Sequence, residues 1–170
     1  MPSRRFWLAT VNRLVMKTVT IPGWGSIEIK NVVLDLNGTI TESGEPIPGI
    51  LDYLQTLSNK GFEVYILSGD TRGILREKFE HISAVHTVSA ETAGAKKAFV
   101  ESIGPEVTVC IGNGNIDIGM FKISGLSICT IQAEGASANA LLHTDIVVTH
   151  VRQAIDIILD SKKLIATLRR

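Results

Sequence analysis

The stretch VVLDLNGTIT, residues 32–41, places an aspartate directly after a run of apolar residues and directly before an Asn-Gly-Thr turn. The apolar run is typical of a buried strand, and the turn residues end that strand sharply. Asp35 therefore stands at the carboxyl end of a predicted core strand. Strand ends of this kind gather at one edge of a parallel sheet, where α/β proteins bind their ligands.

Short β-rich runs alternate with helix-like segments along the rest of the chain. Strands are predicted at 62–67, 84–88, 107–111, 126–131 and 145–148, and helices at 48–60, 71–81, 91–104, 115–124, 135–143 and 151–160. This alternation predicts a doubly wound parallel α/β sheet with right-handed crossovers. Segments 19–21 and 26–36 flank Pro-Gly-Trp-Gly, which predicts an N-terminal hairpin whose second arm continues into the first core strand.

Composition narrows the classes of partner. The chain has 170 residues, of which 45% are hydrophobic and 20% charged, as expected for one ordinary domain. Lys plus Arg and Asp plus Glu both total 17, so no basic field points to nucleic acid or to a membrane surface. No apolar run approaches the ~20 residues that span a bilayer. Both cysteines lie in apolar runs, which favours buried, reduced thiols and a cytoplasmic location.

The two ends of the chain receive simpler interpretations. Residues 1–15 are interpreted as a tail or an upstream extension, with either Met1 or Met16 as the start, and residues 16–170 as a single domain. The closing segment SKKLIATLRR, residues 161–170, is interpreted as a solvated basic tail.

Asp35 is a candidate nucleophile for a phosphoryl group. A carboxylate can form an aspartyl phosphate when a metal ion and a cation offset the negative charges that meet. The turn at 36–39 can supply backbone N–H groups that cradle the phosphoryl oxygens, because glycine lets the backbone approach closely. Ser68, in LSGD after the strand at 62–67, can supply a hydroxyl that contacts the same oxygens.

Two later strand ends offer a cation and metal ligands. Lys96 or Lys97 opens the helix after the third predicted strand, and the four-residue spacing between Lys96 and Val100 favours Lys96. Asn113 and Asp117, in IGNGNID after the fourth strand, offer the oxygen ligands that magnesium prefers.

These motifs, taken in order, resemble those of the haloacid dehalogenase superfamily from residue 32 to about 160. DLNGT at 35–39 is similar to the first motif of that superfamily, DxDGT, and Ser68, Lys96 and GNGNID match its later motifs. LSGDTRG, KKAFVESIG and EGASANALLHTDIVV further resemble the phosphorylation domain of P-type ATPases. Several motifs in the right order are more specific than any one of them alone.

The resemblance implies a Rossmann-like three-layer sandwich with strand order 3-2-1-4-5, and a magnesium-dependent phosphatase that forms an aspartyl phosphate. The site that it implies has catalytic Asp35, Asn37 and Lys96, phosphate-binding Asn37, Gly38, Ser68, Gly69 and Lys96, and metal-binding Asp35, Asn37, Asn113 and Asp117. Asp35 and Ser68 are only 33 positions apart, which leaves no room for a nucleotide domain or a cap domain. The chain thus resembles the soluble, capless P-type-ATPase-like phosphatases, which act on phosphorylated substrates. An open site also predicts a homo-oligomer in which one subunit covers the site of another.

Two departures from the motifs leave a second interpretation open. Asn37 stands where most phosphatases of the superfamily carry an acid/base aspartate, and an amide cannot donate and then recover a proton. Asn113 removes one negative charge from the expected metal site. The chain is therefore either a slow enzyme or a non-catalytic phosphate-binding or assembly module. Asp70 could shape its loop or act near the metal, while Glu134 and Ser137 are interpreted as an N-terminal helix signal.

Overall fold

A computed structural model describes residues 15–69, 79 and 85–170. Its centre is a six-stranded parallel sheet in the order β10-β9-β8-β3-β6-β7. The strands are β3 (Asn31–Asp35), β6 (Glu63–Ser68), β7 (Val85–Ser89), β8 (Thr108–Gly112), β9 (Leu126–Thr130) and β10 (Ile146–Val148). The predicted order of the first five strands is confirmed, and β10 adds a sixth beyond β9.

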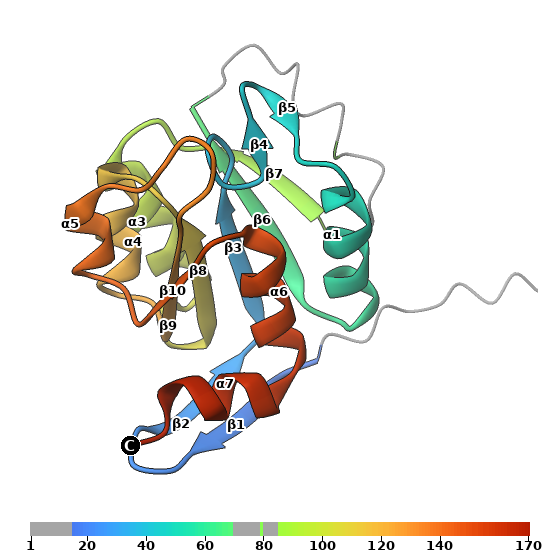
Figure 1. The fold of residues 1–170 in the computed structure, drawn as a ribbon, viewed down its shortest axis with the longest axis vertical. Helices are drawn as coiled ribbons and strands as arrows, with labels where there is room; N and C mark the ends of the chain where they lie inside the picture. The colour runs from blue at the N-terminus through green and yellow to red at the C-terminus, as the bar shows by residue number, and fades with distance from the viewer. Residues whose placement is uncertain (1–14, 70–78, 80–84) are drawn as a thin grey trace, which may run out of the picture.

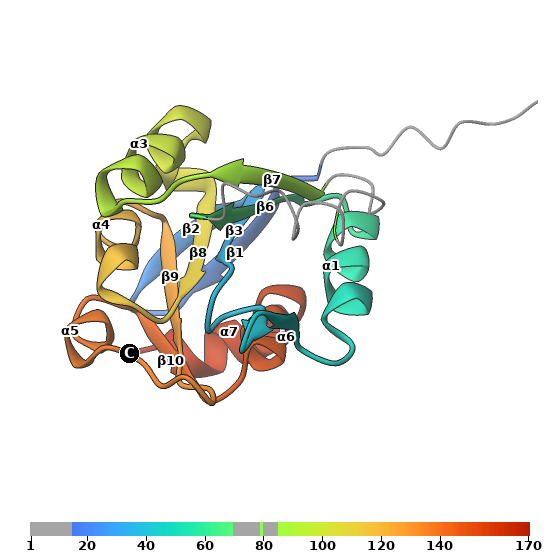
Figure 2. The same cartoon turned by 90° about the horizontal axis from the view of Figure 1, so that it is seen from above.

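Helices cover both faces of this sheet, which gives the predicted three layers (Figures 1 and 2). One face carries α1 (Ile50–Asn59) and α6 (Val151–Leu159), and the other carries α3 (Ala93–Ile103), α4 (Ile118–Phe121) and α5 (Ala138–Leu141). Successive side chains of a strand point to opposite faces. In β3, Leu34 therefore joins the core under α1 and α6, while Val33 joins the core under α3 and α4. Short 3-10 turns at Pro105–Val107 and Asn115–Asp117 flank β8.

The predicted N-terminal hairpin is present and is covered by a helix that the sequence reading missed. Strands β1 (Lys17–Ile21) and β2 (Gly25–Ile29) pair antiparallel, and β2 leads directly into β3. The interpretation of residues 161–170 as a solvated tail is wrong, because Ser161–Leu168 form helix α7 against this hairpin (Figure 1). Leu164 is completely buried in the contact, since the apolar residues of the segment share one helix face.

A second, very short hairpin follows the turn after β3. It consists of β4 (Thr41–Glu42) and β5 (Glu45–Pro46), and it lies beyond the carboxyl end of β3 (Figure 1). Its tip residues Ser43 and Gly44 both have positive φ angles, as the type I′ turn of a two-residue hairpin requires. Two-residue strands are too short to show a periodic pattern, so they are not predictable from the sequence. Between β3 and β6 the chain holds only this hairpin and α1, which leaves no cap domain in that interval.

Other sequence predictions can be checked on the same residues. The predicted helix at 71–81 lies outside the described residues, apart from the buried Phe79. Cys110 and Cys129 are free and buried, as predicted, and burial raises the pKa of the Cys110 thiol to about 12. Within residues 15–69 and 85–170, no helix is both long enough and apolar enough to cross a bilayer.

Candidate active site

The carboxyl ends of β3, β6 and β8 meet at one edge of the sheet. Asp35, the last residue of β3, pairs with Leu67 of β6, so Ser68 and Gly69 follow one step beyond it. A cavity of about 430 Å³ opens at this edge. It is lined by Asp35, Asn37, Gly69, Glu91, Lys96, Asn113, Gly114, Ile116 and Asp117. The structure therefore brings together candidate residues from four separate segments of the sequence.

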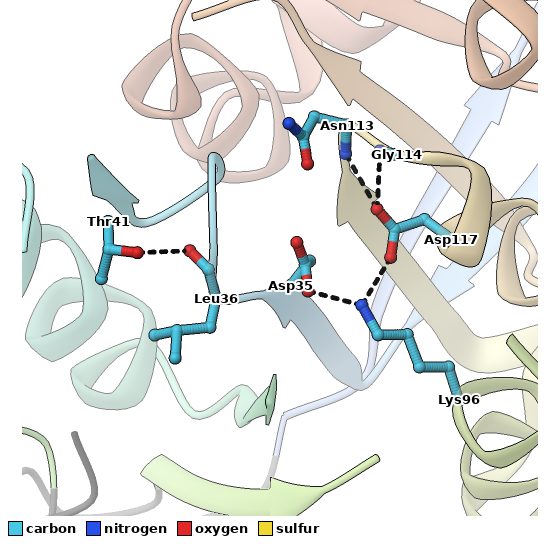
Figure 3. A network of polar contacts seen from close by, with 7 residues as sticks. All are labelled: Asp35, Leu36, Thr41, Lys96, Asn113, Gly114 and Asp117. Atoms are coloured by element: carbon cyan, nitrogen blue, oxygen red, sulfur yellow. Dashed lines mark hydrogen bonds and ion pairs between the residues drawn. The ribbon is translucent and has the colours of Figure 1, made fainter. Parts of the chain in front are cut away.

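Lys96, and not Lys97, reaches Asp35. Helix α3 buries Lys96 and Val100 on one face, which is the four-residue spacing that the sequence prediction used. The ammonium Nζ of Lys96 donates to Asp35 Oδ1 at 2.5 Å and to Asp117 Oδ1 at 2.7 Å (Figure 3). Lys97 points to solvent and pairs with Glu101 on the same helix. The alternative that the sequence left open is decided by this geometry.

Asp117 uses both of its carboxylate oxygens within the protein. Oδ1 accepts the hydrogen bond from Lys96, and Oδ2 accepts from the backbone N–H groups of Asn113 (3.0 Å) and Gly114 (2.9 Å). A side chain at Gly112 would collide with this carboxylate, so the turn after β8 requires glycine there. In the structure this carboxylate holds Lys96 and the turn after β8. The metal role that the sequence predicts for Asp117 stays a prediction.

The buried charges are unbalanced in favour of the carboxylates. Asp35 is 6% exposed, Lys96 1% and Asp117 0%. Burial and the neighbouring Asp117 raise the pKa of Asp35 to about 6, although Lys96 acts in the opposite direction. Burial alone would lower the pKa of Lys96, but Asp117 and Asp35 outweigh it and hold that pKa above its usual value. Two carboxylates thus share one ammonium, and a further cation would be favourable beside Asp35.

The turn at 36–39 has fewer backbone N–H groups available for phosphate than the sequence predicts. Three of the four N–H groups in the turn at 36–39 already have acceptors: Leu36 donates to Leu67 O, Gly38 to Thr41 O and Thr39 to Leu36 O. Among the described residues, the N–H of Asn37 is the one in this turn that has no such acceptor. Gly38 has φ of 74°, and a Cβ there would lie 2.5 Å from Asn113 Nδ2, so both conformation and space require glycine.

The oxygens around Asp35 fit a small hard cation. Asn113 Nδ2 donates to Gly135 O at 3.1 Å, which fixes the orientation of the amide. Figure 3 shows Asn113 Oδ1 pointing toward the carboxylate oxygen of Asp35 that Lys96 does not bind. Magnesium prefers such oxygen donors and keeps several waters. Within the described part of the chain, no three His, Cys, Asp or Glu side chains cluster as a metal site.

Two residues near the site were missed or misread in the sequence. Gln132 donates to the carbonyl oxygens of Gly38 and Thr39 in the turn after β3. Glu134 is not a helix signal, because its Oε1 accepts from the backbone N–H of Ser43 in the β4–β5 hairpin at 3.1 Å. Both residues follow β9 and thus lie at the same edge of the sheet as Asp35. The strand-end rule that found the other candidates could have found them too.

Ser137 and Asp70 are the other two residues that the sequence singled out near the site. Ser137 occupies the N-cap position of α5 without a side-chain capping bond, and its hydroxyl donates to Asn115 Oδ1 instead. Asp70 lies outside the described residues.

Sequence comparison finds similarity to two curated proteins of Methanocaldococcus jannaschii. A soluble P-type ATPase-like phosphatase is 24% identical over 140 residues, which cover 79% of this chain and 51% of that protein. An uncharacterized protein is 43% identical over 61 residues, which cover 36% of this chain and 66% of that protein. The chain thus spans between about half and just under two thirds of the length of these relatives. No protein-family model matches the chain.

Solved structures with the same fold include several phosphatases. The 3-deoxy-D-manno-octulosonate 8-phosphate phosphatase of Moraxella catarrhalis, in complex with magnesium and phosphate ions, matches with a TM-score of 0.66 and 17% identity, over 83% of this chain and 94% of that one. The cobalt-bound phosphatase of the same name from Haemophilus influenzae matches with a TM-score of 0.63 and 20% identity, over 84% and 94%. A haloacid dehalogenase family protein from Streptomyces avermitilis matches with a TM-score of 0.62 and 22% identity, over 78% and 84%. The chain has the haloacid dehalogenase-like fold, as the sequence motifs predict.

Proposed function

We propose that this protein is a metal-dependent phosphatase that forms an aspartyl phosphate on Asp35. The observation that carries the proposal is the position of Asp35, which lines an open cavity with one oxygen on the buried ammonium of Lys96 and the other turned toward Asn113. The phosphatases among the relatives and the structural neighbours support it. The neighbours that hold magnesium or cobalt support a divalent metal, for which magnesium is the proposed choice.

In the proposed reaction, a carboxylate oxygen of Asp35 forms a bond to phosphorus while the bond from phosphorus to the leaving alcohol breaks. The N–H of Asn37 donates to a phosphoryl oxygen, and Gly38, Ser68 and Gly69 border the same group. Lys96 keeps one oxygen of Asp35 hydrogen-bonded and offsets the charge that accumulates. Water then attacks the aspartyl phosphate and releases phosphate, which restores the carboxylate.

Magnesium would be held by Asp35, the backbone carbonyl of Asn37 and Asn113, and would offset the negative charge of the phosphoryl group. In this proposal Asp117 positions Lys96 and the turn after β8. Asn37 has no proton to give to the leaving group and none to take from the attacking water. We therefore expect slow turnover and fastest reaction with leaving groups that depart without a proton.

A turnover assay tests the proposal. The parent and Asp35→Asn are incubated with magnesium and an aryl phosphate, and the release of the aryl alcohol is followed. Asp52→Asn serves as the matched control, because Asp52 is exposed on α1. Turnover in the parent and in the control, with none in Asp35→Asn, is the expected result. Equal background in all three would favour a non-catalytic phosphate-binding module.

We also infer that a second copy of the chain covers the open cavity. Ile116 lines the cavity and is 45% exposed. It follows β8 at the edge that holds Asp35, and a covering subunit would bury it and exclude water from the reaction. Light scattering at the concentrations used for the assay should show a homo-oligomer. A monomer that turns over substrate would contradict this inference.

A further inference from the structure

One amide side chain connects the turn after β3 to the start of α6. Gln132 follows β9, and its Nε2 donates to Gly38 O at 3.0 Å and to Thr39 O at 2.8 Å. Its Oε1 accepts from the backbone N–H of Val151, the first residue of α6, at 2.9 Å. Gln132 is not among the residues that line the cavity. It therefore reaches the site through the backbone of the turn.

The turn that Gln132 holds contains Gly38, whose backbone is more easily rotated than that of other residues. Gly38 has a left-handed conformation and no side chain, so the peptide groups beside it have more freedom than those of other residues. The peptide between Asn37 and Gly38 carries the Asn37 carbonyl, and the peptide before it carries the Asn37 N–H. The proposed function assigns this carbonyl to the metal and this N–H to the phosphate. A rotation at Gly38 would displace both from Asp35.

We infer that Gln132 is a positioning residue for the phosphorylation site, an inference that rests on the function proposed for Asp35. Its two N–H bonds fix the carbonyls of Gly38 and Thr39, and through them the orientation of Asn37. The role needs a donor and an acceptor in one side chain. A carboxylate at this position would still accept from Val151, but it would face two carbonyl oxygens without a proton to share.

Substitutions at Gln132 can separate its donor role toward the turn from its acceptor role toward α6. Gln132→Glu keeps the acceptor at the N-terminus of α6, where a negative charge is favourable, and loses both donors to the turn. Gln132→Met loses both halves. Gln153→Met is the matched control, because Gln153 Oε1 accepts from the N–H groups of Thr149 and His150 at the same helix end and does not touch the turn.

Four measurements on the four proteins test the inference. The magnesium affinity measured by calorimetry and the single-turnover rate with an aryl phosphate should both fall about 10- to 100-fold in Gln132→Glu and Gln132→Met, which is the usual effect of losing a group that orients a metal ligand. The KM for the aryl phosphate should change less than the rate. Hydrogen exchange at the amides of 36–41 in the metal-free protein should be faster in both variants. Gln153→Met should match the parent in all four.

The outcomes separate this inference from the proposed function. A folded Gln132→Glu that keeps the exchange rates, magnesium affinity and phosphorylation rate of the parent would overturn the positioning role. A parent that binds magnesium but is never phosphorylated would overturn the proposed function, and exchange and magnesium affinity would still decide the role of Gln132. Equal losses in Gln132→Glu and Gln153→Met would show that the helix end, and not the turn, is what matters, which also contradicts the inference.

Discussion

Lys96 Nζ lies 2.5 Å from Asp35 Oδ1, and both groups are buried at the carboxyl edge of the sheet. The same ammonium lies 2.7 Å from Asp117, so it holds two carboxylates from different strand ends. The contact occupies one oxygen of Asp35 and leaves the other directed into the site (Figure 3). A single lysine thereby orients the proposed nucleophile without blocking it.

Removal of this ammonium should destabilise the protein strongly. Lys96→Met leaves two buried carboxylates without their shared cation, and breaking a buried pair costs about 3–5 kcal/mol. Lys97→Met, the neighbouring control, removes only an exposed pair with Glu101 and should cost less than about 1 kcal/mol. Urea denaturation of both variants measures the difference. Equal and small losses would show that the buried contact contributes little.

The raised pKa of Asp35 predicts how the metal-free protein responds to pH. A carboxyl group whose pKa is higher in the folded chain binds its proton more tightly there. Its contribution to stability is full below the ordinary pKa of 3.8 and is lost as pH rises through about 6. Asp35→Asn has no such loss, so its free energy of unfolding relative to the parent should increase between pH ~4 and ~7. Urea denaturation in the presence of a chelator measures this difference. A difference in free energy of unfolding that does not change with pH would contradict the assigned pKa.

Asn113 is proposed to contribute an uncharged oxygen to the metal. Asn113→Asp should tighten magnesium binding, by about tenfold, because a second carboxylate would face the cation. Asn113→Leu should weaken it. Asn139→Asp, an exposed position on α5, adds the same charge away from the cavity and serves as the control in calorimetry. Identical affinities in all four proteins would place the metal elsewhere.

The strands and the candidate residues Asp35 and Lys96 could be predicted from the sequence for a physical reason. In a parallel sheet buried on both faces, each strand is a compact apolar run, and a polar residue directly after the run marks the functional edge. All five residues of β3 are buried and Asp35 ends the strand, so the pattern was clear. Lys96 was found because its spacing to Val100 placed both on the buried face of α3.

The remaining features depend on contacts between distant segments. Helix α7 carries four polar or charged residues among eight, and it forms because the N-terminal hairpin offers Leu164 an apolar surface. Gln132 and the turn at 36–41 are more than 90 positions apart, and an amide side chain has no pattern that identifies its partners. The use of Asp117 as a structural acceptor likewise depends on backbone N–H groups whose directions the sequence does not specify.

The amide at position 37 is predicted to limit the release of phosphate. Asn37→Asp restores a group that can donate a proton to the leaving group and take one from water. Steady-state turnover should rise, by up to about 10² to 10⁴, and most with poor leaving groups. Stopped-flow assays on the parent should show a burst followed by slow turnover, and the variant should lose the burst. A variant without gain, together with a parent without a burst, would favour the non-catalytic interpretation.

The central claim, that Asp35 is phosphorylated, is tested most directly by trapping the intermediate. The parent is mixed with magnesium and an aryl phosphate, quenched in acid, digested and analysed by mass spectrometry, beside Asp35→Asn and Asp52→Asn. The account predicts one added phosphoryl group on the peptide that contains Asp35 in the parent and in Asp52→Asn, removable by hydroxylamine, and none in Asp35→Asn. Release of the aryl alcohol without any labelled peptide, or equal labelling of all three proteins, would contradict it.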